Sequence, residues 1–167
     1  MPSPELLEVS VAEADIRIYF SPEHRPERRI EEVLDTAENP LGIEVYAFTS
    51  PRLARALTDA HRRLGNVRVL MDSGQYHAWK AQRKVFRFLE EAGVPVVLDL
   101  EASLNHNKVL VEQSRRVVTG SYNWTKAART QVENIIVITN PVVADFYWDH
   151  FEKRWARNRR THRAVSG

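Results

Sequence analysis

The chain has 167 residues, of which 43% are apolar and 28% charged, a composition typical of a globular protein with one hydrophobic core. The absence of cysteine excludes disulfide bonds, zinc–thiolate sites and thiol catalysis. The net charge of +2 argues against a uniformly basic protein that coats nucleic acid, and no apolar run reaches the roughly 18 residues of a membrane span, so we expect no integral membrane association.

The first hundred residues alternate between strand-like and helix-like patterns. Apolar residues at every second position predict the first strand, and Ser50-Pro51 and Gly65 are typical start and stop signals for a helix. The predicted strands cover residues 16–20, 42–48, 67–71 and 94–100, and the predicted helices cover residues 30–37, 50–65 and 77–92. Strands that alternate with helices of this length favour an α/β fold, with a mixed, largely parallel sheet flanked by helices on both faces.

The pattern changes after residue 100. Only a few polar residues separate the strand-like segments 108–111 and 116–119, which predicts an antiparallel hairpin. The remaining predicted elements are a short helix over residues 126–129, a strand over residues 134–139 and an aromatic-rich helix from Pro141. We therefore predict a single domain over residues 14–167, preceded by a flexible segment over residues 1–13.

One constellation of polar residues suits a phosphate ligand. His106 and Lys108 stand two positions apart at the entry to a strand, which places them on one face. The hairpin returns the chain to Gly120-Ser121 and Asn123 beside them, and glycine allows the backbone to approach a ligand closely. An imidazole, an ammonium, a hydroxyl and a carboxamide thus converge without an acidic residue in the motif.

The pattern His-x-Lys, followed by Gly-Ser-x-Asn, resembles the signature of the phospholipase D superfamily. Further likeness to the small, single-motif bacterial nucleases of that superfamily lies in residues 19–22, 46–49, 123–128 and 133–134 and in the Trp-containing last helix. The resemblance extends over nearly the whole chain and implies a phospholipase D-like fold.

The sequence departs from the family pattern at one position. The family motif continues with an aspartate four residues beyond the lysine, and that position holds Gln113 here, preceded by Glu112. In the family this aspartate lies beyond the strand and away from the reacting phosphate. We therefore expect the departure to affect the stability of the turn rather than the chemistry.

The resemblance also implies roles for individual residues. His106 is the expected nucleophile, which forms a phosphohistidine that water then hydrolyses. Lys108 is expected to neutralise phosphate oxygens, and Ser121 and Asn123 to donate hydrogen bonds to them. Glu133 matches the carboxylate that bonds the rear nitrogen of the nucleophilic histidine and fixes its tautomer. No metal ion and no cofactor enters this chemistry.

The chain contains a single His-x-Lys motif, whereas the reaction needs a second protonated group for the leaving oxygen. Two-motif relatives supply both histidines from one chain. We therefore predict a homodimer in which His106 and its symmetry mate share one site across the two-fold axis. The other histidines are expected to be surface or packing residues.

Three interpretations of the function remain open. The first is DNA, or RNA, bound with the help of Lys126 and of the basic run from Lys153 to Arg163, which includes Arg154 and Arg157. That run is equally typical of a solvated helix face. The second is a phospholipid such as cardiolipin, and the third is a nucleic-acid-binding module with a decayed site. We interpret Trp124 as core rather than as a base-stacking residue.

The start of the chain, Met1-Pro2-Ser3-Pro4-Glu5, lacks the basic and apolar regions of a signal peptide. We therefore expect no export signal in this sequence. Relatives are often exported, so localisation stays open between the cytoplasm and export after signal removal.

Overall fold

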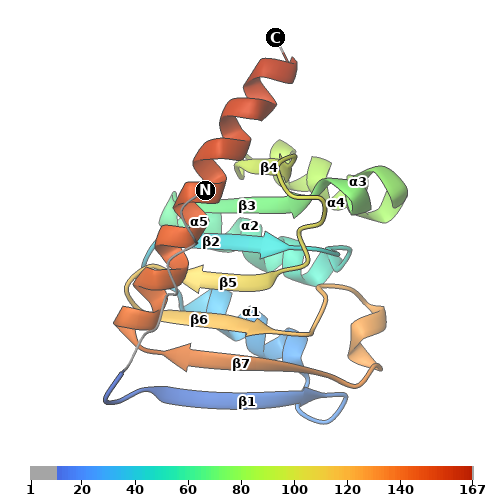
Figure 1. Cartoon of the computed structure of the whole chain (residues 1–167). Coiled ribbons are helices and arrows are strands. Elements are labelled where there is room, and N and C mark those ends of the chain that lie inside the picture. Colours follow the sequence, from blue (N-terminus) through green and yellow to red (C-terminus); the bar gives the residue numbers. More distant parts are fainter. Residues whose placement is uncertain (1–10, 167) are drawn as a thin grey trace.

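The computed structural model describes residues 11–166, with side chains described through Thr161, and contains one seven-stranded sheet (Figure 1). The strands are β1 (Asp15–Ser21), β2 (Leu41–Val45), β3 (Val67–Asp72), β4 (Val96–Asp99), β5 (Lys108–Glu112), β6 (Arg116–Gly120) and β7 (Glu133–Thr139). The helices are α1 (Pro26–Thr36), α2 (Pro51–Leu64), α3 (Ser73–Ala78), α4 (Lys80–Glu91), the short 3-10 helix η1 (Ala127–Arg129) and α5 (Pro141–Ser166). The segment predicted to be flexible lies mostly outside the described residues.

The strands are arranged in the order β1-β7-β6-β5-β2-β3-β4. The predicted mixed α/β class is confirmed, but the expectation of a largely parallel sheet is wrong. Only the β2–β3 and β3–β4 pairs are parallel, and the other pairs are antiparallel. The difference arises because β1 does not pair with β2. It lies at the far edge against β7, and the short turn between β5 and β6 forces an antiparallel pair.

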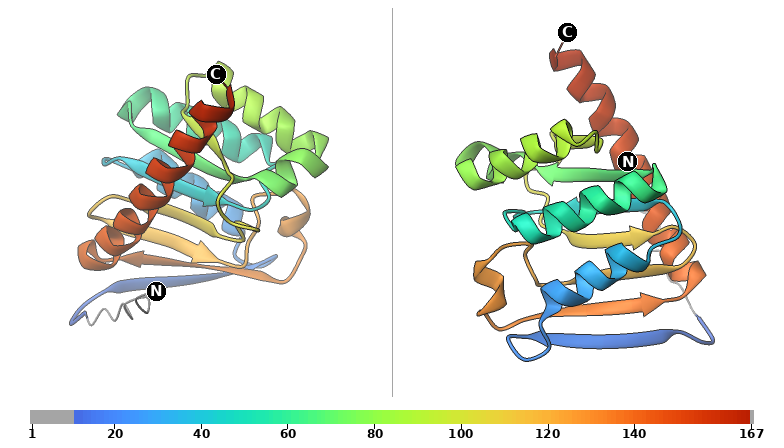
Figure 2. Two further views of the ribbon diagram at one scale, coloured as in Figure 1. Left: turned by 45° about the horizontal axis from the view of Figure 1, so that its top comes forward. Right: turned by 180° about the vertical axis from the view of Figure 1, so that it is seen from behind.

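Helices cover both faces of the sheet, as predicted (Figure 2). Helices α1, α2 and α4 lie on one face, where Leu34, Leu57 and Phe86 contribute to the larger core. Helix α5 crosses the other face and contributes Trp148, Phe151 and Trp155 to a second core. Alternate residues of each strand point into one core or the other.

The predicted helix over residues 77–92 is two helices, α3 and α4, separated at Trp79. Trp79 has an extended backbone with φ −114° and ψ 116°, which ends the helical hydrogen-bonding pattern. The first helix starts earlier than predicted because the Asp72 carboxylate accepts a hydrogen bond from the Gln75 N–H at 2.7 Å and so caps it. This cap places Gln75 near the end of β2.

The strand directions bring several chain ends to one edge of the sheet. β5 and β7 run antiparallel to their neighbours, so their first residues lie beside the last residues of β2, β6 and β1 (Figure 1). Because the residues expected to be catalytic lie at these strand ends, we call this the catalytic edge, defined by Ser21, Val45, Lys108, Gly120 and Glu133. Helix α5 crosses nearer the opposite edge.

Candidate active site

His106 and Lys108 lie at the start of β5, on the catalytic edge. Lys108 pairs with Val45, the last residue of β2, whereas His106 belongs to the segment that enters the strand. The imidazole of His106 is exposed, but Lys108 is only 8% exposed. Its ammonium donates a hydrogen bond to the carbonyl of His106 at 2.6 Å. The two groups are therefore held together locally, with His106 open to a substrate and Lys108 behind it.

Tyr46 contacts both of these residues. Its ring lies 4.6 Å from the ring of His106 between centroids, and the Lys108 Nζ lies 5.0 Å from the same ring centre, which is a cation–π contact. Gln75 donates a hydrogen bond to its hydroxyl at 2.8 Å, and Gln82 donates one to its carbonyl at 2.9 Å. Sequence reasoning gave Tyr46 no role, although its place directly after a buried strand was a usable signal.

The electrostatic setting of Lys108 has two opposing causes. Burial lowers the pKa of its ammonium below the ordinary lysine value, and the charge of Glu133 partly raises it again. Glu133 is half-buried at the start of β7, where its N–H donates to the Ser21 hydroxyl at 3.1 Å. Glu133 and His106 both lie in the described part of the chain, and the Glu133 carboxylate makes no hydrogen bond to His106. The role that the resemblance implied for Glu133 therefore stays a prediction.

Ser121 and Asn123 follow β6 at the same edge. Gly120 has φ +153°, and a Cβ at this position would meet the Asn134 carbonyl oxygen at 2.3 Å, so the turn requires glycine. Ser121 is exposed, and its hydroxyl accepts a hydrogen bond from the Asn134 N–H at 3.1 Å. The Oδ1 atom of Asn123 is buried without a hydrogen-bond partner. This oxygen can accept a hydrogen bond, whereas contact with a phosphate oxygen would require the Nδ2 group of the same side chain.

Trp124 continues this segment inward. It is 2% exposed and packs edge-on against Phe48, with ring centroids 5.0 Å apart. Its interpretation as a core residue is confirmed.

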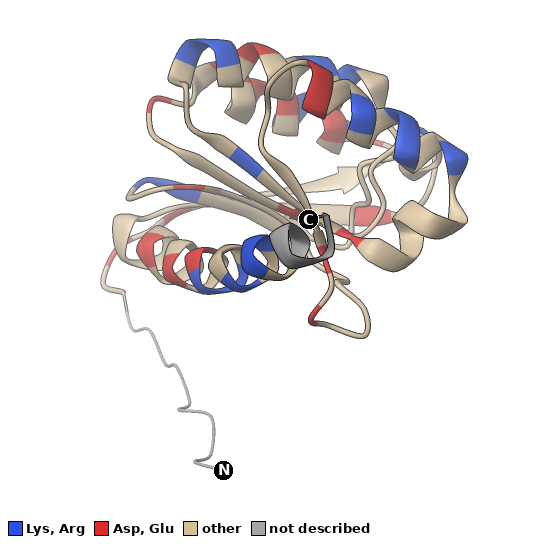
Figure 3. Ribbon diagram, turned by 90° about the horizontal axis from the view of Figure 1, so that it is seen from above, with Lys and Arg blue, Asp and Glu red and all other residues tan. Residues whose placement is uncertain are grey.

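The expected substrate-binding residues lie in different surroundings. Lys126 and Arg157 are exposed, on the segment before η1 and on α5 respectively. Arg154 is not available to a substrate, because its guanidinium pairs with the nearly fully buried carboxylates of Glu44, at 3.0 Å, and Asp99. The expectation for Arg154 is therefore corrected. Along α5, acidic positions give way to basic ones toward its C-terminal part (Figure 3).

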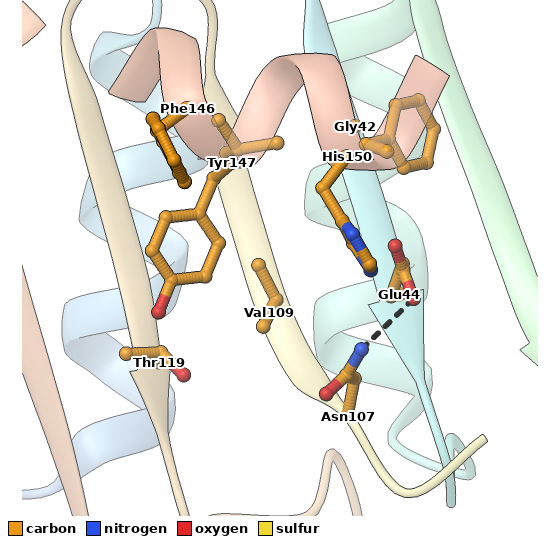
Figure 4. Close-up of a pocket in the computed structure, with 10 residues that line it drawn as sticks. Gly42, Glu44, Asn107, Val109, Thr119, Phe146, Tyr147 and His150 are labelled. Atoms are coloured by element: carbon orange, nitrogen blue, oxygen red, sulfur yellow. Dashed lines mark hydrogen bonds between the residues drawn. The ribbon is translucent and has the colours of Figure 1, made fainter. Parts of the chain in front are cut away.

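A pocket of about 340 Å³ lies on the face of the sheet that α5 covers, between β5 and α5 (Figure 4). Tyr147 and His150 of α5 line it, and Asn107 donates a hydrogen bond to Glu44 on its floor at 3.0 Å. Asn107 and Val109 face this pocket, so Lys108 between them points to the other face. Within residues 11–161, no group of three or more His, Asp or Glu side chains comes together to hold a metal ion.

The sequence pattern of the family described as "cardiolipin synthase, PLD-like domain" matches residues 30–155, which is most of the chain. The chain belongs to the phospholipase D superfamily. The matched range contains the residues of the catalytic edge except Ser21, and the fold agrees with this membership. Members of the superfamily hydrolyse phosphodiesters, and the chain is therefore a phosphodiester hydrolase.

Curated relatives carry two kinds of name. The chain is 29% identical to a phospholipase D from Rickettsia bellii over 161 residues, which cover 94% of this chain and 79% of the relative. It is 38% identical to the mitochondrial cardiolipin hydrolase of Xenopus laevis over 120 residues, which cover 71% of this chain and 56% of the relative. The chain thus spans little more than half of that second enzyme.

Solved structures agree with the superfamily fold. Nuc from Salmonella typhimurium, a phospholipase D family member, matches with a TM-score of 0.80 and 29% identity over 86% of this chain and 95% of Nuc. NucT from Helicobacter pylori matches with a TM-score of 0.76 at 20% identity, a likeness of fold alone. No helix in the described part of the chain is long and apolar enough to cross a membrane.

Proposed function

We propose that this phosphodiester hydrolase cleaves nucleic acid, DNA or RNA, without a divalent metal, through a phosphohistidine on His106. The observation that carries the proposal is an exposed His106 beside a buried Lys108, both in contact with the ring of Tyr46. This arrangement supplies a nucleophile and a fixed positive charge at one place.

The neutral imidazole of His106 donates an electron pair to phosphorus, and the bond from phosphorus to the leaving oxygen breaks. A second imidazolium gives its proton to that oxygen. Water then attacks the phosphohistidine, its proton goes to the same second imidazole, and His106 is released. Lys108 stabilises the negative charge on the phosphoryl oxygens, and Ser121 and Asn123 bind them through hydrogen bonds.

The second imidazole comes, in this proposal, from a partner copy of the chain. One chain carries a single His-x-Lys motif, and His106 faces outward at the catalytic edge. A two-fold axis beside this edge gives each dimer one site with two His106 and two Lys108 residues. Sedimentation is expected to show a dimer at micromolar concentration, and a fully active monomer would contradict this arrangement.

Nucleic acid is favoured over lipid by the structural likeness to Nuc, which spans 95% of that protein, and by the resemblance to small bacterial nucleases. Lipid is the second candidate, because the relatives named phospholipase D and cardiolipin hydrolase are similar over most of this chain. An intact set of His106, Lys108 and Asn123 argues against a decayed binding module.

The deciding experiment compares plasmid DNA with cardiolipin vesicles, each in excess EDTA. We expect DNA cleavage that resists EDTA and a loss of at least 10³-fold in kcat for His106→Ala, with DNA binding retained. The matched control is His61→Asn, at the end of α2 and away from the catalytic edge. Turnover of cardiolipin without DNA cleavage would favour the second candidate. Full activity of His106→Ala would refute the mechanism.

A further inference from the structure

A second cavity, of about 330 Å³, lies on the α1/α2 side of the catalytic edge. It follows the end of β1 and reaches η1. Its lining is rich in arginine and contains one carboxylate: Pro22, Arg25, Pro26, Glu27, Arg28, Arg52, Tyr122 and Arg129. We call it the arginine pocket.

The first turns of two helices border the arginine pocket. Pro26 opens α1 and Arg52 lies in the first turn of α2. Both helices therefore point the positive ends of their dipoles toward this part of the molecule. Arg25, the residue before α1, provides no side-chain cap, but Pro26 has no N–H and the N–H groups of Arg28 and Arg29 donate to the Arg25 carbonyl, so the Glu27 N–H is the one in this first turn that can still bind an anion.

The charges in the arginine pocket do not cancel. Glu27 accepts a hydrogen bond from Ser50 at 2.5 Å and pairs with Arg129 at 2.7 Å, so the one lining carboxylate is already used. Arg52 pairs with Glu31 outside the lining. Arg28 makes only an exposed contact of 3.5 Å with Glu32, and within the described residues no carboxylate lies within ion-pair distance of Arg25. Two cations thus remain for an anion.

Tyr122 points independently to a ligand. It is 1% exposed, lines the pocket, and its hydroxyl has no hydrogen-bond partner within the described structure. Burial, helped by the charge of Glu27, raises its pKa to about 12, so the hydroxyl stays protonated and can donate at neutral pH. A buried hydroxyl without a partner is costly, and an anionic oxygen in the pocket would satisfy it.

The arginine pocket adjoins the catalytic groups. Tyr122 stands between Ser121 and Asn123 in the chain, and the charge of Glu133 raises the pKa of both Lys108 and Tyr122. One carboxylate therefore acts on a residue of each site. The segment 121–123 therefore contributes residues to both sites.

We propose that the arginine pocket binds a second phosphate of the substrate, next to the phosphodiester that is cleaved, and that this second phosphate belongs to a polynucleotide. Arg25 and Arg28 neutralise this phosphate and Tyr122 donates a hydrogen bond to it. The inference rests on the proposed function, because it presumes hydrolysis at His106.

The test compares two substrates that differ in the number of phosphates. Bis(p-nitrophenyl) phosphate has one phosphodiester, and a single-stranded DNA oligonucleotide has many. The variants are Tyr122→Phe and the double variant Arg25→Asn with Arg28→Gln, and the matched control is Arg62→Gln, an exposed arginine at the other end of α2. Asparagine is chosen at position 25 because Arg25 has φ 51°, which asparagine tolerates.

The ratio of kcat/KM for DNA to that for bis(p-nitrophenyl) phosphate is expected to fall about tenfold in the arginine variant and about three- to tenfold in Tyr122→Phe. The salt dependence of DNA binding should weaken by about 0.7 in logarithmic slope in the arginine variant, as for one lost phosphate contact on a single strand. Melting curves check that each variant folds. Tyr122→Phe removes an unpaired hydroxyl, so it should fold even where the arginine variant does not.

Each outcome has a distinct meaning. If the wild type cleaves neither compound, or cleaves only the small ester and cardiolipin vesicles, the proposed nuclease function fails and the pocket inference fails with it. If the wild type cleaves DNA but the ratio and the salt slope stay unchanged in folded variants, the nuclease survives and the arginine pocket is not a phosphate site. A loss confined to cardiolipin would assign the second phosphate to a lipid and overturn the inference.

Discussion

The ring of Tyr46 lies 4.6 Å from the imidazole of His106 between centroids, with 59° between their planes. The same ring contacts the ammonium of Lys108, and Gln75 holds its hydroxyl. We infer that Tyr46 is a positioning residue that holds His106, the proposed nucleophile, and Lys108 relative to each other. Misplacement of a reacting group by about 1 Å can cost a factor of 100 in rate.

Replacement of this ring should reduce catalysis more than it reduces substrate binding. We expect kcat to fall about 10- to 100-fold in Tyr46→Leu, with a change in KM below about threefold, and to fall less in Tyr46→Phe, which loses only the bond from Gln75. Steady-state kinetics on bis(p-nitrophenyl) phosphate provide the measurement, with Tyr147→Phe, on the other face of the sheet, as the control. A rise in KM alone would assign Tyr46 to binding instead.

The charged side chain of Lys108 is expected to lower the stability of the folded chain, although activity requires it. Since burial lowers its pKa, the charged ammonium is less favourable in the folded chain than in the unfolded chain. Lys108→Met should abolish activity and raise the free energy of unfolding by about 0.5–2 kcal/mol at pH 7. The gain should shrink as the pH rises through the lowered pKa toward 10.5, because the folded wild type then loses the proton first. Urea denaturation at pH 7 and pH 10 measures both effects. A variant less stable than the wild type at pH 7 would contradict this view.

The alkaline limb of the pH–rate profile should report the protonation of Lys108. Because its pKa is lowered, kcat/KM should begin to fall at a pH below the ordinary lysine value. The charge of Glu133 raises this pKa, so Glu133→Gln should move the limb to still lower pH, besides any change in maximal rate. Glu90→Gln on α4 is the matched control. A limb that stays in place in Glu133→Gln would mean that another group controls it.

The pair of carboxylates beneath α5 should make Arg154 important for stability rather than for the substrate. Arg154→Leu leaves Glu44 and Asp99 buried without their cation, and we expect a loss of about 3–5 kcal/mol in unfolding free energy. Arg157→Leu, three residues further on an exposed face, should change stability by less than about 0.5 kcal/mol. Thermal denaturation of the two variants gives the comparison, and equal melting temperatures would disprove this role for Arg154.

The sequence predicted the elements better than their arrangement. Local periodicity is set by which residues face a core, so the strands and helices could be located along the chain. The place of β1 depends on a partner more than a hundred residues away, and no local pattern records it. For the same reason Arg154 looked like part of a basic run, because its partners Glu44 and Asp99 lie on distant strands.

The residues of the candidate site could likewise be predicted from the sequence only in part. The motif spacing located His106, Lys108, Ser121 and Asn123, but Tyr46 reaches His106, and Gln75 reaches Tyr46, only through the fold. The doubt about the turn at Gln113 also has a structural answer. The preceding Glu112 is fully buried, accepts hydrogen bonds from two backbone N–H groups near the end of α1, and pairs with Arg115 and Arg116. This network holds the turn without the family's aspartate.

The position of β7 between β1 and β6 affects how the protein can fold during its synthesis on the ribosome. β1 cannot join the sheet until residues 133–139 have been made, because β7 is its strand partner in the described part of the chain. Contacts between such distant segments form slowly. A nascent chain that ends before β7 lacks the strand beside Gly120 and the carboxylate of Glu133, so we expect it to be inert. The capacity to cut a phosphodiester then arises only after residues 133–139 have been made.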